Sequence, residues 1–250
     1  MISLQSITKE FKKGHDMVKV IDGIDLEIKK GEFVTVFGPN GSGKTTLLNI
    51  VAGIDKPTAG DVSIDNKKAA DINVGYVFQN YNESLFPWKT VFENVIFPLE
   101  IAKIGKKECV KIGEHLLIKV GLLHLKDKYV YELSGGQRQL VSICRAMAQK
   151  PDLLIMDEPF SSLDYSTTRK MELNLLDVWE EQKITTLFVS HDIDEAIFLA
   201  DRVVVLSPLP SKIKKIFEVK LPRPRTLDML ASSEFTQLRN EILHTFEYEK

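Results

Sequence analysis

Two hydrophobic patterns alternate along the 250-residue chain. In its first third, apolar side chains recur at every second position in "ISLQSI" (2–7), "KVIDGIDLEI" (19–28) and "EFVTVFG" (32–38). This two-residue period is typical of strands with one buried face, so it predicts an N-terminal sheet. Asp61 is placed in a turn-like break, and "VGYVFQ" (74–79) is predicted to be a further buried strand.

From residue 88 to residue 149 the pattern changes to that of α-helices. Apolar residues recur at spacings of three and four, which places them on one helical face. One such set is Cys109, Ile112, Leu116, Val120 and Leu123. A helical insert is therefore predicted after the first sheet.

Strands and helices then alternate again. "DLLIMD" (152–157), "ITTLFVS" (184–190) and "RVVVLS" (202–207) are apolar runs, with a helix expected from about Ser166. Such alternation is typical of an α/β fold with a parallel sheet covered by helices. "LPRPR" (221–225) interrupts the pattern. A terminal helix that must dock its apolar side is marked by Phe235, Leu238, Ile242 and Phe246.

Composition argues against several classes of protein. A formal net charge of −2 gives no basic footprint for nucleic acid, and no apolar run approaches the roughly 20 residues that span a bilayer. The N-terminus lacks the apolar core of a secretory signal, so a cytosolic location is expected. Cys109 and Cys144 lie in helical patterns without metal or disulfide spacing, and both are interpreted as core packing.

"GPNGSGKT" (38–45) follows a predicted strand and opens a helix, which is the setting of a Walker A phosphate loop. Glycines let the backbone amides point at a phosphate, Lys44 adds positive charge, and Thr45 can bind Mg²⁺. A chance glycine-rich turn is the weaker alternative. The residues expected at the nucleotide are Gly38, Pro39, Asn40, Gly41, Ser42, Gly43, Lys44, Thr45 and Thr46.

"LLIMDEP" (153–159) is an apolar strand that ends in two carboxylates. Ligands bind at the carboxyl ends of strands in open parallel sheets, so Asp157 can hold Mg²⁺ and Glu158 can accept a proton from attacking water. Alone, this pair would more often be a solvated turn. Beside the phosphate loop it favours a nucleotide site, although kinases and switch GTPases share this much.

A second anion-binding turn lies in "ELSGGQRQL" (132–140). A serine and two glycines leave three backbone amides uncovered at a helix start, although an ordinary serine-capped helix is the alternative. "LSGGQRQ" between a Walker A and a Walker B motif resembles the signature of the ATP-binding cassette (ABC) family, and the resemblance covers essentially the whole chain. In that family the signature binds ATP held by a partner subunit. The resemblance therefore assigns Ser134, Gly135, Gly136 and Gln137 to a nucleotide site completed in trans.

The resemblance also implies an architecture. It is a P-loop NTPase (RecA-like) α/β core with an N-terminal antiparallel β-subdomain and an inserted α-helical subdomain. The core is expected over 1–87 and 150–220, the helical signature subdomain over 88–149, and a C-terminal helical extension over 221–250.

Four further residues match family motifs. Gln79 resembles the Q-loop glutamine that senses Mg²⁺ and attacking water, and Asp164 closes "SSLD" (161–164), which resembles the D-loop at the dimer seam. His191 resembles the switch histidine at the γ-phosphate, and Phe11 falls where the family stacks adenine. The alternatives are a structural histidine and core packing of Phe11. The other histidines are expected at the surface: His15, His115, His124 and His244.

The implied activity is ATP hydrolysis by a dimer that sandwiches two ATP molecules. The catalytic residues would be Lys44, Gln79, Glu158 and His191. Mg²⁺ would be bound by Thr45, Gln79 and Asp157.

The resemblance implies that the energy of ATP hydrolysis drives a separate membrane permease. "SLFPWKTVFENV" (84–95) and "SHDIDEAIFLADRVVVLSP" (190–208) look most like the nitrate, sulfonate and taurine importer group. This implies a homodimer or a pair with a similar ATPase, bound peripherally at the cytoplasmic face of the membrane and served indirectly by an external substrate-binding protein. Phe86, Pro87 and Trp88 would lie near the permease groove, although Trp88 could equally be internal packing.

The alternative functions are those of soluble ABC ATPases that act in DNA maintenance or on the ribosome. Members of those groups interrupt the cassette with long coiled coils or carry two cassettes per chain, and neither feature occurs here. The cargo stays open among sulfonate, nitrate and thiamine-precursor pyrimidines.

Overall fold

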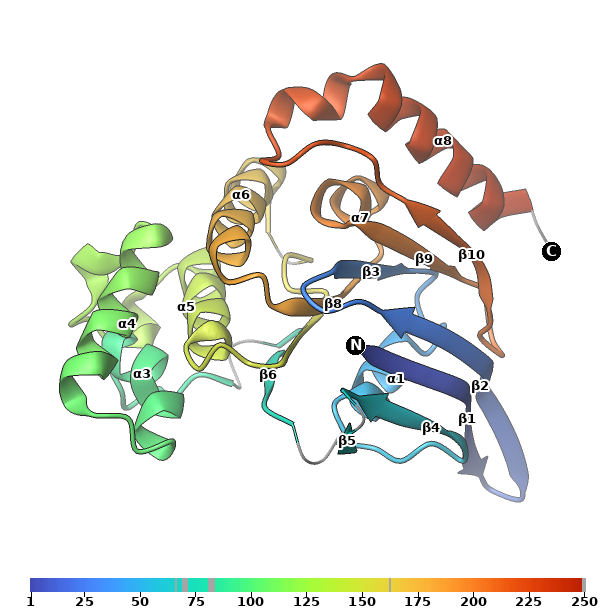
Figure 1. Ribbon diagram of the computed structural model, residues 1–250, viewed down its shortest axis with the longest axis horizontal. Coiled ribbons are helices and arrows are strands. Elements are labelled where there is room, and N and C mark those ends of the chain that lie inside the picture. Colours follow the sequence, from blue (N-terminus) through green and yellow to red (C-terminus); the bar gives the residue numbers. More distant parts are fainter. Residues whose placement is uncertain (66, 69–71, 81–83, 162, 249–250) are drawn as a thin grey trace. The chain divides into compact units, whose positions relative to one another are not determined.

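The computed structural model describes residues 1–65, 67–68, 72–80, 84–161 and 163–248. The chain divides into two compact units. Unit 1 combines Met1–Asn73 with Thr185–Lys250, and unit 2 is Val74–Ile184. Figure 1 colours both units along the sequence. The predicted division into a core, a signature subdomain and a C-terminal extension draws its boundaries elsewhere and stays a prediction.

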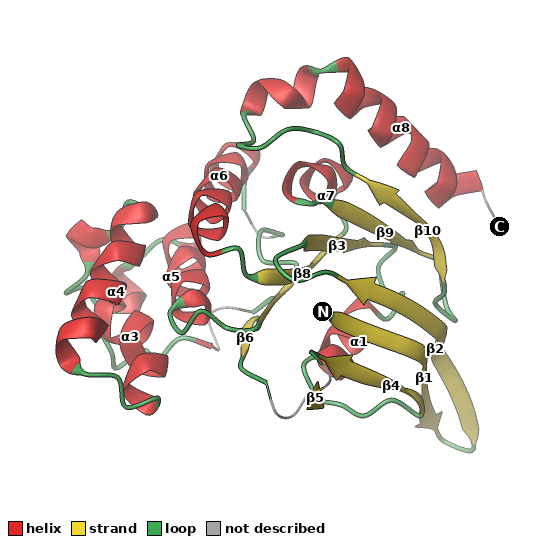
Figure 2. Ribbon diagram, viewed as in Figure 1, coloured by secondary structure: helices red, strands yellow, loops and turns green. Residues whose placement is uncertain are grey.

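Unit 1 begins with the antiparallel sheet that the two-residue period predicts. Its strands are β1 (Ile2–Lys13), β2 (Asp16–Ile28), β4 (Ala59–Ile64) and β5 (Lys67–Lys68), in the order β2-β1-β4-β5. Figure 2 shows β1, β2 and β4 side by side. Asp61 lies within β4 and pairs with Gln5, so its placement in a turn was wrong. The sequence pattern did not predict the start of β4, because its first residues, "AGD", are all exposed and only the last three alternate between buried and less buried positions.

The second sheet region of unit 1 is built from apolar runs. β3 (Phe33–Phe37) lies between β8 (Thr185–Ser190) and β9 (Arg202–Leu206) and is parallel to both. Every residue of β3 and β8 is buried, as expected for parallel strands covered on both faces. β10 (Ile213–Glu218) pairs antiparallel with β9. The sequence reading missed β10 because this mostly polar edge strand buries only Phe217.

The described part of unit 1 contains the α-helices α1 (Lys44–Val51), α7 (Ile193–Leu199) and α8 (Ser233–Tyr248). The terminal helix α8 docks against α7, β9 and β10. Phe235 and Ile242 are buried on its inner side, and the Phe246 ring lies 5.1 Å from that of Phe37. The predicted docking of the last helix is therefore confirmed.

Arginines from the "LPRPR" segment attach the chain between β10 and α8 to the rest of unit 1. The guanidinium of Arg223 pairs with Asp201 at 2.9 Å and donates to the Leu199 carbonyl at 2.7 Å. Buried Arg225 donates to the Ala200 carbonyl at 2.8 Å. This segment breaks the secondary structure, as predicted, and is nevertheless firmly bonded.

Unit 2 holds the parallel pair β6 (Val74–Val77) and β7 (Leu153–Asp157). Its described helices include α3 (Val91–Ile101), α4 (Lys106–Lys119), α5 (Gly135–Met147) and α6 (Tyr165–Gln182). Helix α5 contacts α3, α4, α6 and β6, as Figure 1 shows for α3 and α4. Short 3₁₀ turns occur at Leu123–Leu125 and Val130–Glu132 in this unit and at Leu227–Ala231 in unit 1.

The helical insert is confirmed, but the predicted apolar face is shorter than expected. Cys109 and Leu116 are buried on α4, which ends at Lys119, and Leu123 lies in a separate 3₁₀ turn after Gly121, whose φ is 70°. Met171, Leu175 and Trp179 are buried on α6, as predicted. Cys144 is buried on α5, which raises the pKa of its thiol to about 12, so both cysteines are core residues as predicted. Within the described ranges, no helix is both long enough and apolar enough to cross a bilayer.

Candidate functional site

The phosphate loop of unit 1 connects the buried strand β3 to helix α1. Gly41 and Gly43 have φ angles of 77° and 84°, a left-handed conformation that glycine adopts without steric cost. A Cβ on Gly41 would meet nothing within 4 Å, whereas one on Gly43 would lie 2.7 Å from Val20 Cγ1. One glycine therefore borders open space and the other lies directly on β2.

The loop carries the donors that a phosphate needs. Lys44 is buried, and its Nζ donates to the carbonyls of Gly38 (3.0 Å) and Pro39 (3.1 Å), which places its charge across the loop. Ser42 Oγ is buried without a hydrogen-bond partner among the described residues. Thr45 is exposed in the first turn of α1. Because a buried hydroxyl, a lysine and a helix start converge, these residues fit a phosphate with its metal ion.

Two other predicted site residues lie in unit 1. His191 follows β8 directly and is exposed, as are the four other histidines, whose surface location is thereby confirmed. Phe11 on β1 is 42% exposed, and the Lys9 ammonium lies 4.9 Å from its ring centroid. Core packing of Phe11 was therefore the wrong alternative. Its role in stacking adenine stays a prediction.

In unit 2 the two carboxylates of "LLIMDEP" have different settings. Asp157 is buried at the end of β7, whereas Glu158 is half-buried and has a left-handed φ of 43°. A non-glycine residue in this conformation is unusual and occurs often at functional sites. Gln79 lies exposed beyond β6. Burial, with a smaller contribution from Asp157, raises the pKa of the Tyr76 phenol on the neighbouring strand.

The signature turn is a capping box at the start of α5. Ser134 Oγ accepts from the Gln137 amide at 3.3 Å, and Gln137 Oε1 accepts from the Ser134 amide at 2.9 Å. The expectation of three uncovered amides was therefore wrong for Ser134. The amides of Gly135 and Gly136 occupy helix positions that have no partner within the helix. The Ser134 hydroxyl still keeps its hydrogen for donation, because capping uses only an oxygen lone pair.

Helix α6 packs directly against the signature turn. A Cβ on Gly136 would lie 2.7 Å from Met171 Cε and 3.2 Å from Thr167 Cγ2. Sequence reasoning missed both residues as neighbours of the signature, since no local pattern links positions more than 30 residues apart. A side chain at position 136 would therefore require Met171 and Thr167 of α6 to shift.

Asp164, which closes the predicted D-loop, begins the same helix. Its carboxylate accepts from the Thr167 amide (3.1 Å), the Thr167 hydroxyl (2.6 Å) and the Ser166 hydroxyl (2.9 Å). The Thr167 bonds and that from Ser166 lower the pKa of Asp164 to about 2. Thr167 thus contacts both the signature glycine and the D-loop aspartate, and Ser162 of "SSLD" lies outside the described residues.

The aromatic residues of the predicted permease groove lie before α3. Trp88 is 70% exposed, so its internal packing was the wrong alternative. The Phe86 ring lies 5.4 Å from Trp88 and 4.6 Å from Phe97, with the Arg145 guanidinium 5.6 Å from its centroid. These contacts hold Phe86 in place beside an exposed indole.

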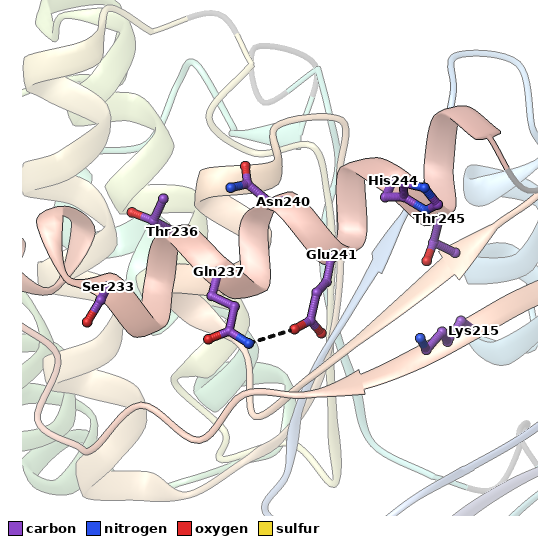
Figure 3. Close-up of a pocket in the computed structure, with 8 residues that line it drawn as sticks. All are labelled: Lys215, Ser233, Thr236, Gln237, Asn240, Glu241, His244 and Thr245. Atoms are coloured by element: carbon purple, nitrogen blue, oxygen red, sulfur yellow. Dashed lines mark hydrogen bonds between the residues drawn. The ribbon is translucent and has the colours of Figure 1, made fainter.

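A separate open cavity of about 800 Å³ lies along α8 and β10 in unit 1 (Figure 3). The residues that line it include Lys215, Asn240 and His244, and Gln237 donates to Glu241 at 3.1 Å. None of the predicted site residues is among the described residues that line it. This cavity is therefore distinct from the phosphate loop.

Comparison with known proteins yields one family. Residues 21–161 match the family model described as "ABC transporter". An uncharacterised ABC transporter ATP-binding protein of Methanocaldococcus jannaschii is 44% identical, with 99% of this chain and 92% of that protein covered. The aliphatic sulfonates import ATP-binding protein SsuB of Bacillus cereus is 40% identical over 99% of this chain and 96% of its own length.

A solved structure matches as well. It is the dimeric post-hydrolysis state of the ATP-binding cassette MJ0796 bound to ADP and Pi, with a TM-score of 0.77 and 34% identity. The match covers 89% of this chain and all of that chain.

Proposed function

Because this chain belongs to the ABC transporter family, we propose that it is the ATP-hydrolysing subunit of an importer for small sulfonates. The protein is an ATPase that uses ATP and Mg²⁺. The observation that carries the proposal is the 40% identity to a sulfonate-import ATPase along 99% of the chain. Similarity of that extent includes the phosphate loop, the signature turn and the C-terminal segment.

Nucleotide binding is assigned to the phosphate loop, Phe11 and Asp157. The loop amides and the buried Lys44 ammonium would bind the β- and γ-phosphate oxygens, and the left-handed glycines at 41 and 43 allow the backbone to curve around a phosphate. Thr45 and Asp157 would hold Mg²⁺, which neutralises phosphate charge when it is bound. Phe11 would stack on the adenine ring through its exposed face.

Hydrolysis is assigned to a set of polar side chains around the γ-phosphate. Glu158, which has a left-handed backbone conformation directly after β7, would accept the proton of the attacking water. Gln79 would orient that water, and His191 would donate to the γ-phosphate. Both side chains are exposed at strand ends, so either can reach a ligand.

The signature turn is assigned to the nucleotide of a second copy. Ser134 can cap α5 and still donate its hydroxyl hydrogen, and the Gly135 and Gly136 amides add two donors. Asp164, on the helix that backs Gly136, would then lie at the dimer seam. A dimer of this kind agrees with the dimeric relative bound to ADP and Pi.

The energy of hydrolysis would pass to a permease. The exposed Trp88 beside the anchored Phe86 is the surface we assign to that contact. The subunit would bind at the cytoplasmic face of the membrane, and an external binding protein would deliver the solute to the permease.

The test is complementation in the host organism. A deletion strain should fail to grow on an aliphatic sulfonate as its sole sulfur source, yet grow on sulfate. The wild-type gene should restore growth. Glu158→Gln should not, because loss of the proton acceptor is expected to slow hydrolysis by about 10²- to 10⁴-fold while ATP still binds. Glu234→Gln, an exposed carboxylate on α8, is the matched control and should restore growth.

Two outcomes would contradict the proposal. If the deletion strain grows on sulfonates but loses nitrate uptake, the cargo assignment is wrong. If purified Glu158→Gln protein hydrolyses ATP within a few-fold of wild type, the role of Glu158 is wrong.

A further inference from the structure

The turn between β9 and β10 packs against the phosphate loop, although the two are far apart in the sequence. A Cβ on Gly38, the first loop glycine, would lie 3.2 Å from Leu206 Cβ and 3.6 Å from the Leu206 carbonyl oxygen. Leu206 is the last residue of β9. The start of the loop therefore rests on the end of this strand.

Ser211, in the same turn, bonds to the far end of the loop. It is fully buried, and its hydroxyl donates to the Ser42 carbonyl across 169 positions of sequence. Its backbone N–H donates to the Val20 carbonyl at 2.9 Å, and its own carbonyl accepts from the Asp22 amide at 3.0 Å. One residue thus links the phosphate loop to strand β2.

Strand β2 supports the loop at the adjoining residue. Val20 Cγ1 occupies the space beneath Gly43, where a Cβ would lie only 2.7 Å away. The peptide bond between Ser42 and Gly43 is therefore fixed from two directions. Ser211 holds its carbonyl, and Val20 limits the position of its glycine.

The geometry of a trans peptide connects the hydrogen bond between Ser211 and Ser42 to the direction of the next backbone amide. The C=O and N–H of one peptide unit lie in a plane and point in opposite directions. Since the Ser42 carbonyl accepts from the Ser211 hydroxyl, the Gly43 amide in the same unit points away from Ser211. Backbone amides are the phosphate donors of such loops, so a bond that holds the Ser42 carbonyl also fixes the direction of this donor.

We propose that Ser211 is a positioning residue for ATP binding, which orients the Gly43 amide by holding the Ser42 carbonyl. The proposal rests on the assignment of the phosphate loop to ATP. A neutral hydrogen bond contributes modestly, so its loss should weaken ATP binding without abolishing it. The effect should fall on affinity and not on turnover, because Ser211 touches neither the attacking water nor the leaving group.

A matched control lies at the next residue. Lys212 Nζ forms an exposed ion pair with Asp22 at 3.0 Å, and Asp22 also pairs with Lys19 at 2.9 Å. Exposed ion pairs contribute little. Lys212→Ala therefore alters the same turn and the same strand contact but leaves the Ser211 hydroxyl in place. Ser232→Ala removes a hydroxyl that donates to the Met229 carbonyl at 2.7 Å, elsewhere in unit 1.

The experiment measures the ATP dissociation constant, KM and kcat of the full-length chain with Mg²⁺. Ser211→Ala should raise the dissociation constant and KM by about 2- to 10-fold, the equivalent of one hydrogen bond, with kcat unchanged within a factor of about two. Ser211→Cys keeps the shape but is a weak donor, so it should also raise KM. Lys212→Ala and Ser232→Ala should match wild type.

The inference fails if Ser211→Ala binds ATP as wild type does, or if kcat falls while KM stays the same. If Ser211→Ala is insoluble, the same readings on Ser211→Cys decide. Failure of the assignment of the phosphate loop to ATP gives a different result, because Lys44→Ala would then leave ATP binding unchanged.

Discussion

At the scale of single residues, Ser134 combines a structural and a proposed catalytic role. Its oxygen caps α5 through a reciprocal pair of bonds with Gln137. Thr90 makes the same capping box with Glu93 at the start of α3, with bonds of 3.2 and 2.8 Å. The two boxes are nearly identical in geometry, but only Ser134 lies in a signature sequence.

A comparison of variants at Ser134 and Thr90 distinguishes an effect on stability from an effect on activity. Ser134→Ala and Thr90→Ala should each lower the free energy of unfolding by about 0.5–2 kcal/mol, because each removes one helix cap. Only Ser134→Ala should also lower the ATPase rate, since it alone removes a phosphate donor. Denaturant unfolding and ATPase assays on both variants provide the measurement. Equal rates for the two variants would mean that Ser134 is a cap and nothing more.

At the scale of elements, the hydrophobic pattern predicted that a strand or helix exists better than it predicted where that element begins and ends. β3, β7 and β8 are apolar runs buried on both sides, and the terminal helix shows its docking face through Phe235 and Ile242. β10 is an edge strand with mostly polar residues, and the first three residues of β4 are exposed, so neither segment shows that period. An element with one fully buried face has apolar residues at regular spacing, whereas an element that is only partly buried does not.

Close packing of elements also depends on residues whose role the sequence hides. Gly75 in β6 lies against the end of α5, where an added Cβ would meet the Ala146 carbonyl oxygen at 2.4 Å and Pro151 Cγ at 3.0 Å. Backbone on one side and a ring on the other leave little room to yield. Its φ is not positive, so packing alone requires the glycine.

Gly75→Ala should therefore destabilise the protein by about 1–3 kcal/mol through overpacking. Gly105→Ala is the control, because Gly105 precedes α4 with φ at −63° and a Cβ there would meet nothing within 4 Å. The midpoint of chemical denaturation should fall clearly for the first variant and little for the second. Equal midpoints would show that α5 can move away from β6 at no cost.

At the scale of the whole molecule, the proposed mechanism makes one chain an incomplete enzyme. The phosphate loop and the signature turn of the same chain would serve different nucleotides. A mixture of two defective variants tests this. Lys44→Ala impairs the loop and Ser134→Ala impairs the signature, so each homodimer carries the same defect in both of its sites.

A mixed dimer would place both defects in one site and leave the other site intact. Random pairing of equal amounts should then restore up to about a quarter of wild-type ATPase activity, because half of the dimers carry one intact site of two. The recovered ATPase activity is measured while one inactive variant is titrated into the other, with each variant alone as the control. No recovery, in a mixture proven to exchange subunits, would rule out a site shared between chains.

The sequence by itself determined the chemistry and the fold class. Phosphate binding and water activation need particular residue types at fixed short spacings, so "GPNGSGKT", "LLIMDEP" and "LSGGQ" could be identified without coordinates. Only the tertiary structure showed Ser211 at the Ser42 carbonyl, Val20 beneath Gly43, and Thr167 with Met171 behind Gly136. These contacts join segments between about 20 and 170 residues apart, and no periodicity or spacing encodes a contact that exists only because the chain folds back on itself.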